Sequence, residues 1–155
     1  MPLKLTRETE YALKILCQFI ALPSKEGRSV GWIAVTAGLP EPFVAKITQR
    51  LVRAGLLHSE RGHESGYHLA RPAARITLRR VLEAIEGESL FERRVFGKDP
   101  CSDAAPCVLH DRWVAVRTAF VDMAEGTTLE SLAEGGSGRM QSKANHRSAN
   151  RKGGG

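Results

Sequence analysis

The stretch LPEPFVAKITQRLVRAGLLHSERGHESGYHLARP, residues 39–72, contains a helix pattern and a hairpin pattern separated by one glycine. Residues 40–55 carry apolar side chains at helical spacing, which predicts an amphipathic helix that ends at Gly55. Its apolar stripe is expected to consist of Phe43, Val44, Ile47 and Leu51. The strands LLHSE and YHLAR, joined by a turn at residues 61–66, then predict a β-hairpin directly after this helix.

Two further helices are predicted upstream. Residues 6–22 form the first, with Thr6 as its N-cap and two glutamates in the first turn, where the helix dipole favours acids. Its expected inward face is Ala12, Ile15, Leu16, Phe19 and Ile20. Residues 30–38 form a short second helix, capped by Ser29, that is expected to bury Trp32, Ile33 and Val35. A tight turn ending at Pro40 then leads into the third helix, which completes a helix-turn-helix.

A helix-turn-helix followed by a hairpin is a winged helix, whose second helix enters the DNA major groove while the hairpin tip reaches the backbone or minor groove. Arginine and glutamine can make bidentate contacts with base edges, and glycines let the hairpin turn sharply and approach DNA closely. The candidate DNA-binding residues are Glu41, Lys46, Gln49, Arg50 and Arg53 on the helix, and Arg61 and His63 at the hairpin tip. An ordinary solvated helix face would carry a similar row of basic and amide side chains, so it is the adjoining hairpin that favours double-stranded DNA as the partner.

The overall charge contributes little to this prediction. The chain of 155 residues has a formal charge of +6, but residues 135–155 hold five bases and no acid. Residues 1–134 therefore hold 18 bases and 17 acids, a net charge of +1. Residues 135–155 are also poor in apolar side chains, and we expect a disordered basic tail that either contacts phosphates weakly or only aids solubility. The chain contains no long apolar run or signal peptide, which predicts a cytoplasmic protein.

Two more helices are predicted after the hairpin. The first spans residues 77–87, with Leu78, Val81, Leu82 and Ile85 directed inward. The second runs from about residue 108 to residue 125, and its apolar residues recur at spacings of four and three, the pattern of a coiled-coil seam. These seam residues are Leu109, Trp113, Val116, Phe120 and Met123. The seam packs either on its own domain or on a second copy of the chain, and we favour a homodimer, which suits two related DNA half-sites.

The loop VFGKDPCSDAAPCVLHDRW, residues 95–113, brings together soft metal ligands. Cys101 and Cys107 stand six residues apart, and His110 follows three residues later. Thiolates and an imidazole can hold zinc or an iron–sulfur cluster. The spacing alone is equally compatible with a thiol pair that forms a reversible disulfide, or with inert thiols. Cys17 lies within an amphipathic helix and is expected to be a small core residue.

Taken together, the motifs LTRETEYALK, LPEPFVAKITQRLVRAGLL, RGHESGYHLARP, ITLRRVLEAIEG and the paired cysteines give the chain a family resemblance. From about Leu5 to Gly135 it resembles the winged-helix regulators typified by IscR, NsrR and RirA. The resemblance implies a homodimeric bacterial transcription regulator, often a repressor, that senses iron, nitric oxide or redox state. The sensor implied is an iron–sulfur cluster, on the loop before the long helix and near the dimer interface.

The resemblance also implies a set of cluster ligands. Cys101 and Cys107 match the second and third cysteines of the family motif, and His110 matches the histidine that follows. Glu10 matches an acidic position in the first helix of the other subunit, whereas Val95 stands near the position of the first cysteine. Two thiolates with two other ligands suit a two-iron, two-sulfur (2Fe-2S) centre, as Rieske sites illustrate. Since family members without a cluster exist, a cluster-free regulator with a Cys101/Cys107 thiol switch is the alternative.

We therefore expect a mainly α fold with a small β-hairpin wing, divided into three parts. Residues 1–88 form a winged helix-turn-helix, residues 89–134 a sensor loop and dimerisation helix, and residues 135–155 the tail. Two rival functions are a thiol or metal redox protein on a winged-helix scaffold and a winged helix that binds a partner protein. We do not expect an enzyme, because neither a nucleotide-binding loop nor a nucleophile–base pair is recognisable.

Overall fold

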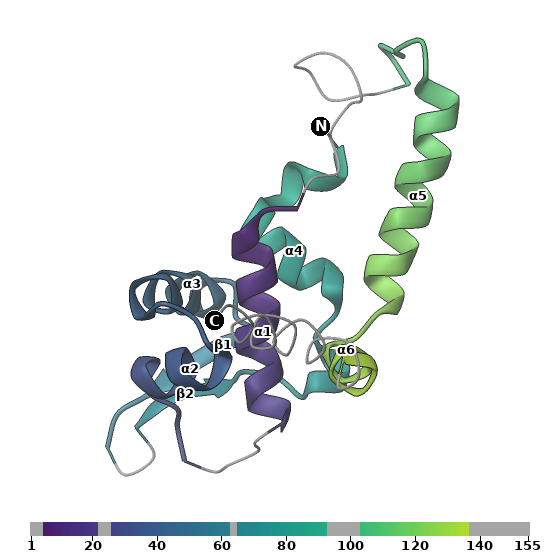
Figure 1. Cartoon of the computed structure of the whole chain (residues 1–155). Coiled ribbons are helices and arrows are strands. Elements are labelled where there is room, and N and C mark those ends of the chain that lie inside the picture. The colour runs from purple at the N-terminus through teal and green to yellow at the C-terminus, as the bar shows by residue number, and fades with distance from the viewer. Residues whose placement is uncertain (1–4, 22–25, 63–64, 93–102, 137–155) are drawn as a thin grey trace, which may run out of the picture.

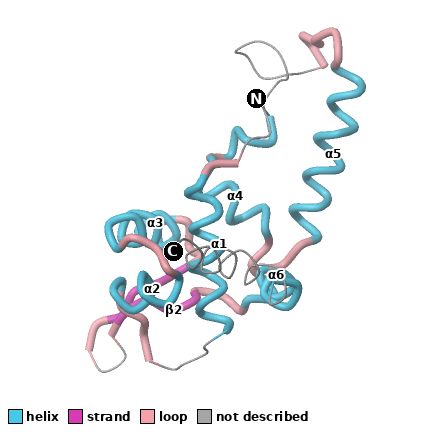
Figure 2. Tube along the Cα trace, viewed as in Figure 1, coloured by secondary structure: helices cyan, strands magenta, loops and turns pink. Residues whose placement is uncertain are grey.

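The computed structural model describes residues 5–21, 26–62, 65–92 and 103–136, and these residues form a mainly helical fold with one antiparallel hairpin (Figures 1 and 2). The α-helices are α1 (Arg7–Ala21), α2 (Val30–Ala37), α3 (Glu41–Arg53), α4 (Leu78–Glu86), α5 (His110–Gly126) and α6 (Leu129–Gly136). The strands are β1 (Leu57–Glu60) and β2 (Gly66–Leu69), and short 3₁₀ helices occur at η1 (Ala73–Arg75) and η2 (Glu88–Glu92). The predicted fold class, a winged helix-turn-helix followed by a long helix, is confirmed.

The helix-turn-helix consists of α2 and α3, and local chemistry defines its boundaries. The Ser29 side chain caps α2 by accepting a hydrogen bond of 3.1 Å from the backbone N–H of Trp32. Gly38 ends α2 in the left-handed conformation, with a φ of 66°, and Pro40 precedes the first turn of α3. Since glycine adopts this conformation without steric cost and proline favours a helix start, both boundaries follow from the sequence.

One core joins α1, α2, α3 and α4 behind the hairpin. Its buried members include inward residues predicted for each of these four helices, namely Ala12, Ile15, Leu16, Ile33, Val44, Ile47, Leu51, Val81 and Ile85. Phe19 and Ile20 are partly buried against the same core, as is Trp32. Thr77 caps α4 by accepting a hydrogen bond from the backbone N–H of Arg80. The burial of these side chains confirms the predicted inward faces of α1 and α4.

Val35, which was predicted to be buried, and Phe43, a member of the predicted apolar stripe, are both exposed. Val35 is 84% exposed, because a residue two positions after Ile33 lies on roughly the opposite side of a helix with 3.6 residues per turn. Phe43 is 47% exposed and lies at the edge of the apolar stripe of α3. Its ring meets Tyr11 of α1 edge-on, with 6.2 Å between the centroids. The expectation that Val35 is buried was therefore wrong, whereas Phe43 forms the exposed edge of the predicted apolar stripe.

The wing contains a third segment besides its two strands. In the predicted hairpin, Leu57 pairs with Leu69 and Glu60 pairs with Gly66. Arg28, just before α2, adds a further bridge through two backbone hydrogen bonds to Tyr67, of 3.0 and 2.9 Å. The hairpin prediction is confirmed, whereas the contribution of Arg28 was not foreseen.

Glycine is required at position 66 for a reason that the sequence analysis did not include. Its φ is +123°, and a Cβ atom at this position would lie 2.7 Å from the backbone carbon of Gly27. Side chains essentially never approach backbone so closely, so the bridge between residues 28 and 67 depends on glycine at position 66. The glycine thus allows close backbone packing within the wing itself.

After α5 the chain returns to the core of the winged helix. The backbone N–H of Leu129 donates to the carbonyl of Ile76 at 2.8 Å, and Leu129 is only 1% exposed within the same core as α1. Helix α6 was not predicted, and it continues to Gly136, two residues into the segment assigned to the tail. Residues 137–155 lie outside the described residues.

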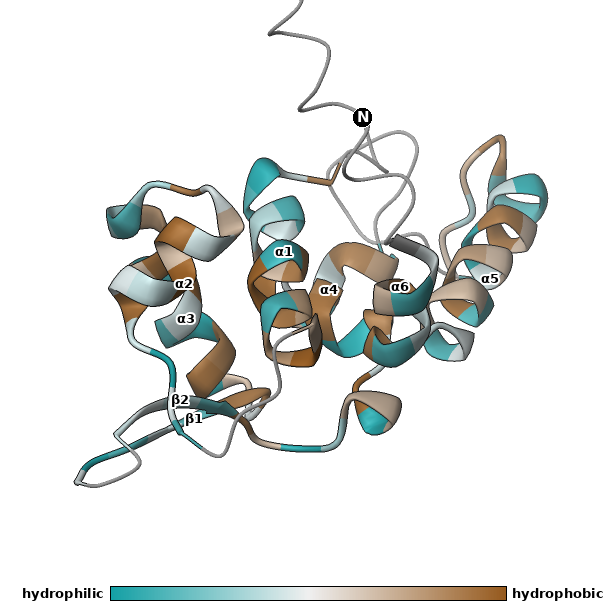
Figure 3. Ribbon diagram, turned by 60° about the horizontal axis from the view of Figure 1, so that its bottom comes forward, coloured by the Kyte–Doolittle hydropathy of each residue, from teal (hydrophilic) through white to brown (hydrophobic). Residues whose placement is uncertain are grey.

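Helix α5 lies at the edge of the molecule, on the far side of α1 from α2 and α3 (Figures 1 and 3). Its C-terminal half packs through Phe120 and Ala124 onto a second apolar cluster with Leu82, Leu90 and Phe91. The rings of Phe91 and Phe120 have centroids 5.4 Å apart. Arg79 of α4 also pairs with Glu125 at the end of α5. None of the described helices is long and apolar enough to cross a membrane.

Candidate functional site

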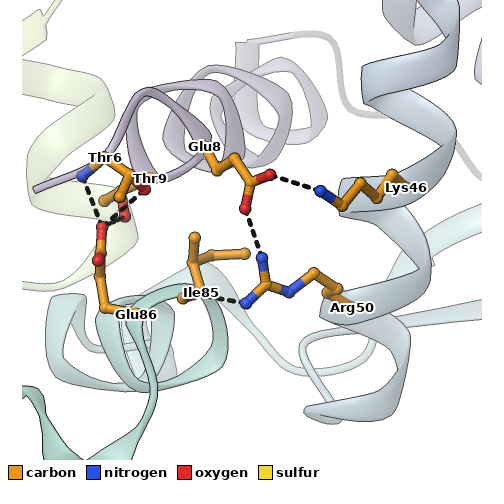
Figure 4. A network of polar contacts seen from close by, with 7 residues as sticks. All are labelled: Thr6, Glu8, Thr9, Lys46, Arg50, Ile85 and Glu86. Atoms are coloured by element: carbon orange, nitrogen blue, oxygen red, sulfur yellow. Dashed lines mark hydrogen bonds and ion pairs between the residues drawn. The ribbon is translucent and has the colours of Figure 1, made fainter.

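The predicted DNA-binding residues of α3 divide into two groups. Lys46, Gln49 and Arg53 are exposed on the side of the helix opposite the buried face of Val44, Ile47 and Leu51, and Glu41 is exposed at the start of the helix. Arg50 differs from them, because its side chain is only 30% exposed and is directed towards α1 and α4 (Figure 4). The structure thus brings Lys46, Gln49 and Arg53 together on one exposed face and separates Arg50 from them.

A carboxylate from α1 lies beside two of these bases. Glu8 accepts a hydrogen bond of 2.7 Å from Nζ of Lys46 and one of 2.5 Å from Nη1 of Arg50 (Figure 4). The hydrogen bond from Lys46 is the main reason that the pKa of Glu8 is lowered, and the charges of Lys46 and Arg50 add to it while burial opposes it. The sequence of α3 could not reveal this partner, because Glu8 belongs to a helix about forty residues upstream.

The wing carries a histidine pair that the sequence analysis did not single out. His58 of β1 and His68 of β2 face each other across the hairpin, and their rings stack with centroids 5.2 Å apart. Nε2 of His58 lies 3.0 Å from a carboxylate oxygen of Glu60. Side chains alternate between the two faces of a strand, so the positions of His58 and His68 in the predicted hairpin could have indicated that the two rings share a face. Arg61 is exposed beyond Glu60, and His63 at the hairpin tip lies outside the described residues.

The second predicted site lies at the start of α5. Cys107 is half-buried, and its carbonyl accepts a hydrogen bond of 2.9 Å from the backbone N–H of His110. Nε2 of His110 lies 3.1 Å from a carboxylate oxygen of Asp103, and the His110 side chain is only 12% exposed. These residues line an open pocket of about 460 Å³ together with Pro106, Val108, Leu109, Asp111 and Arg112.

The structure tests the implied ligand set only in part. Cys101 and Val95 lie outside the described residues, so Cys107 and His110 are the members of the loop set that can be placed. Within the described ranges, no three His, Cys, Asp or Glu side chains are grouped as a metal site would require. A carboxylate beside a histidine nevertheless resembles the outer-shell partner that orients a metal-ligating imidazole. The described residues thus place one cysteine side chain and one imidazole that is hydrogen-bonded to a carboxylate at the start of α5.

Two further residues of the first helix were considered in the sequence analysis. Glu10 is 56% exposed and forms an ion pair with Lys14 one turn later, at 2.9 Å. Cys17 packs against the main core, and burial raises the pKa of its thiol, which keeps it protonated near neutral pH. The expectation that Cys17 is a core residue is confirmed.

The predicted seam of α5 is shared between the interior and the surface. Trp113 is buried with 9% exposure, and Phe120 packs against Phe91 of the same chain. Leu109, Val116 and Met123 are 38%, 48% and 47% exposed. The helix therefore uses part of the predicted stripe for its own fold and presents the remainder at the surface.

Comparisons with known proteins agree with this architecture. A family model described as "Rrf2: Iron-dependent Transcriptional regulator" matches residues 5–135. Protein aau3 of Rhizobium meliloti is 33% identical over 133 residues, which cover 85% of this chain and 86% of that protein. The HTH-type transcriptional regulator IscR of Xenorhabdus nematophila is 29% identical over 133 residues, covering 85% of this chain and 80% of the relative.

Solved structures give the same result. CymR (YrzC), described as the global cysteine regulator of B. subtilis, superposes with a TM-score of 0.70 at 27% identity, covering 85% of this chain and 97% of CymR. The IscR of T. potens has the same fold, with a TM-score of 0.63 at 23% identity over 89% of this chain and 91% of that one. The fold, the family model and the relatives matched over most of their length together establish that the chain belongs to the Rrf2 family of winged-helix transcriptional regulators.

Proposed function

We propose that the chain is a sequence-specific repressor that binds a double-stranded DNA operator as a homodimer, with α3 in the major groove. The observation that carries this proposal is the exposed row of Lys46, Gln49 and Arg53 on the second helix of the helix-turn-helix. Gln49 and Arg53 suit base edges, while Lys46 suits phosphate or guanine. The wing adjoins this face, and Arg61 and His63 at its tip would reach the backbone or minor groove.

The homodimer is supported by the surface of α5. Leu109, Val116 and Met123 leave an apolar row exposed along one helix at the edge of the molecule. Spacings of seven residues place them on one side of a helix, as a two-fold helix–helix contact requires. A second α5 packed against this row would bury it and fix the separation of two α3 helices.

The sensor in this proposal is an iron–sulfur cluster of the two-iron, two-sulfur type. Cys101, Cys107 and His110 would hold it together with Glu10 of the second subunit. The support comes from the residues at the start of α5. Cys107 and His110 are joined by a turn with a backbone hydrogen bond, and a carboxylate oxygen of Asp103 is hydrogen-bonded to the His110 ring. Such a cluster supplies a centre that reacts with oxidants and nitric oxide. The loop that would hold it leads directly into α5, so a change there alters the helix proposed to space the two subunits.

A thiol switch is the second candidate, and the valine near the first cysteine position favours it. With Val95 in that place, Cys101 and Cys107 are the two cysteines of the loop. A peroxide would take two electrons and two protons from this pair, and the sulfurs would join as a disulfide. The same loop would then change shape without any metal.

The first experiment tests the DNA surface. Full-length protein selects its operator from random-sequence duplexes, and the affinity of variants is then measured by fluorescence anisotropy. Gln49→Ala and Arg53→Gln are each expected to cost about 1–3 kcal/mol, and a base-reading residue relaxes the preference at one position. Arg75→Gln is the matched control, because Arg75 is exposed on η1, which packs against α6. Unchanged operator affinity in both α3 variants would refute the placement of α3.

The second experiment separates the two sensors. Protein purified without oxygen is assayed for visible absorption, iron and acid-labile sulfide, beside Cys101→Ser, Cys107→Ser and His110→Ala variants. Near-stoichiometric sulfide that each variant lowers supports the cluster. A colourless protein that, after reconstitution, forms a Cys101–Cys107 disulfide with peroxide and releases DNA supports the thiol switch.

A further inference from the structure

The Arg50 side chain lies where α1, α3 and α4 meet, although Arg50 belongs to the basic side of α3. Its Nη1 donates to Glu8 of α1, and its Nη2 donates to the backbone carbonyl of Ile85 at 2.5 Å (Figure 4). Ile85 is next to last in α4, so its carbonyl is among the four that the helix leaves without an internal partner. A guanidinium at this end of a helix is also favoured by the helix dipole. Arg50 therefore caps α4 while it forms an ion pair with α1.

The exposed fractions separate Arg50 from Lys46. The Arg50 and Glu8 side chains are each 30% exposed, whereas Lys46 is 60% exposed. To reach a base edge, Arg50 would have to give up both of its partners, and hydrogen bonds that involve a charged group are stronger than those between neutral groups. Lys46 would give up one contact of a flexible, exposed side chain. Of the two bases beside Glu8, Lys46 is thus the one available to DNA.

The helix that carries Glu8 is itself anchored on α4. A carboxylate oxygen of Glu86 accepts hydrogen bonds from the backbone N–H of Thr6, from its hydroxyl and from the hydroxyl of Thr9, at 2.7, 2.8 and 2.6 Å. Thr9 is buried, whereas the two hydrogen bonds from Thr6 lie at the surface. The start of α1 is thus fixed to the end of α4 on one side and holds α3 through Glu8 on the other (Figure 4).

We propose that Glu8 is a positioning residue for DNA recognition, which retains Arg50 as an internal tie and thereby fixes how α3 presents Gln49 and Arg53. In this arrangement Arg50 orients the recognition helix and does not read bases. The carboxylate also offsets positive charge beside α3, which lowers attraction to DNA of any sequence. Glu8 therefore raises specificity in two ways, by aligning the base-reading side chains and by limiting non-specific binding. This inference rests on the proposed placement of α3 in the major groove.

The test compares full-length wild-type and Glu8→Gln protein on the selected operator and on random duplex, across a range of salt concentrations. Glutamine keeps the shape of glutamate but loses its charge. Operator affinity is expected to fall about tenfold, which is the loss of one charge-assisted hydrogen bond. Affinity for random duplex is expected to rise, and the slope of log K against log salt to steepen by about one, because a released cation neutralises one more phosphate.

Three comparisons make the outcome decisive. Glu130→Gln on the exposed surface of α6 removes the same charge and is expected to change neither affinity. Glu8→Asp keeps the charge but shortens the reach to Arg50, so operator affinity falls while binding to random duplex stays unchanged. In a double-mutant cycle, Arg50→Gln and Glu8→Gln are expected to be non-additive on the operator, because both break one tie.

Several results would overturn the proposal. Equal losses on operator and random duplex with an unchanged salt slope would mean that Glu8 only supports the fold. Equal gains on both would mean that it only repels DNA, and additive losses in the cycle would make Arg50 an independent DNA contact. If Glu8→Gln does not fold, as circular dichroism would reveal, Glu8→Asp decides alone. Failure of the proposed function is recognised separately, because Gln49→Ala and Arg53→Gln would then leave operator binding unchanged in an otherwise wild-type chain.

Discussion

Replacing Gly66 tests the packing of the wing directly, because a side chain at this position is disfavoured both by a steric clash and by the positive φ. In Gly66→Ala the new methyl group would lie 2.7 Å from the backbone carbon of Gly27 and 2.8 Å from the backbone nitrogen of Arg28, so the segment before α2 must move away. That movement breaks the two hydrogen bonds between Arg28 and Tyr67, worth about 1 kcal/mol each. The positive φ adds about 1–2 kcal/mol for any residue with a side chain. The expected loss of folding free energy is therefore about 3–4 kcal/mol.

Gly62→Ala is the matched control for this prediction. Gly62 also has a positive φ, of +99°, but a Cβ atom there would meet none of the described residues within 4 Å. Only the backbone strain of about 1–2 kcal/mol is expected in this variant. Urea unfolding followed by circular dichroism gives both free energies, with the slope m as a check that the unfolded state is unchanged. A Gly66→Ala loss no larger than that of Gly62→Ala would refute the reasoning about the bridge.

Three further predictions concern α6, Glu8 and α5. Leu129→Ala is expected to lower the free energy of unfolding by about 2–5 kcal/mol, because Leu129 is buried in the main core; a loss below about 1 kcal/mol in urea unfolding would contradict this. Because the pKa of Glu8 is lowered in the folded state, its ion pairs stabilise the fold above the pKa of the unfolded state and are lost as the pH falls through the lower folded value. The free energy of unfolding of the wild type is therefore expected to decline more than that of Glu8→Gln on acidification below about pH 5. Parallel curves of stability against pH would contradict this prediction. Val116→Glu places a charge on the exposed row of α5 and is expected to yield monomers in analytical ultracentrifugation, with Glu130→Gln as control; an intact dimer would exclude this row as the interface.

Local patterns were sufficient for most of the winged helix. The caps Ser29 and Thr77 and the helical spacing of apolar residues are properties of neighbouring positions, so α2 and α4 begin where the sequence predicted. The hairpin followed from alternation and turn residues within about fifteen positions. The resemblance to a regulator family was likewise carried by local motifs, and the family is confirmed.

Predictions that depended on a helix's neighbours were less successful. Val35 was expected inside because α2 is apolar on nearly all sides, and only packing against α1 and α3 selects the side that is buried. Helix α6 was missed because LESLAEGG is short and weakly patterned, yet Leu129 completes the core of residues far upstream. The cluster ligands Cys101, Cys107, His110 and Glu10 all stay predictions, since Cys101 lies outside the described residues and Glu10 would come from a second subunit.

The sequence by itself determined the order and type of the helices from α1 to α5 and of the two strands, because caps, glycines and apolar spacing act over one or two turns of chain. Tertiary structure decided what the charged residues of α3 do. Lys46, Arg50 and Gln49 belong to one stripe in the sequence, but the packing of α1 against α3 brings Glu8 to two of them and turns Arg50 towards α4. The same holds for the steric requirement at Gly66, because the backbone of Gly27 lies where a side chain at position 66 would begin. Contacts between residues about forty positions apart depend on how helices pack, and no local pattern records that packing.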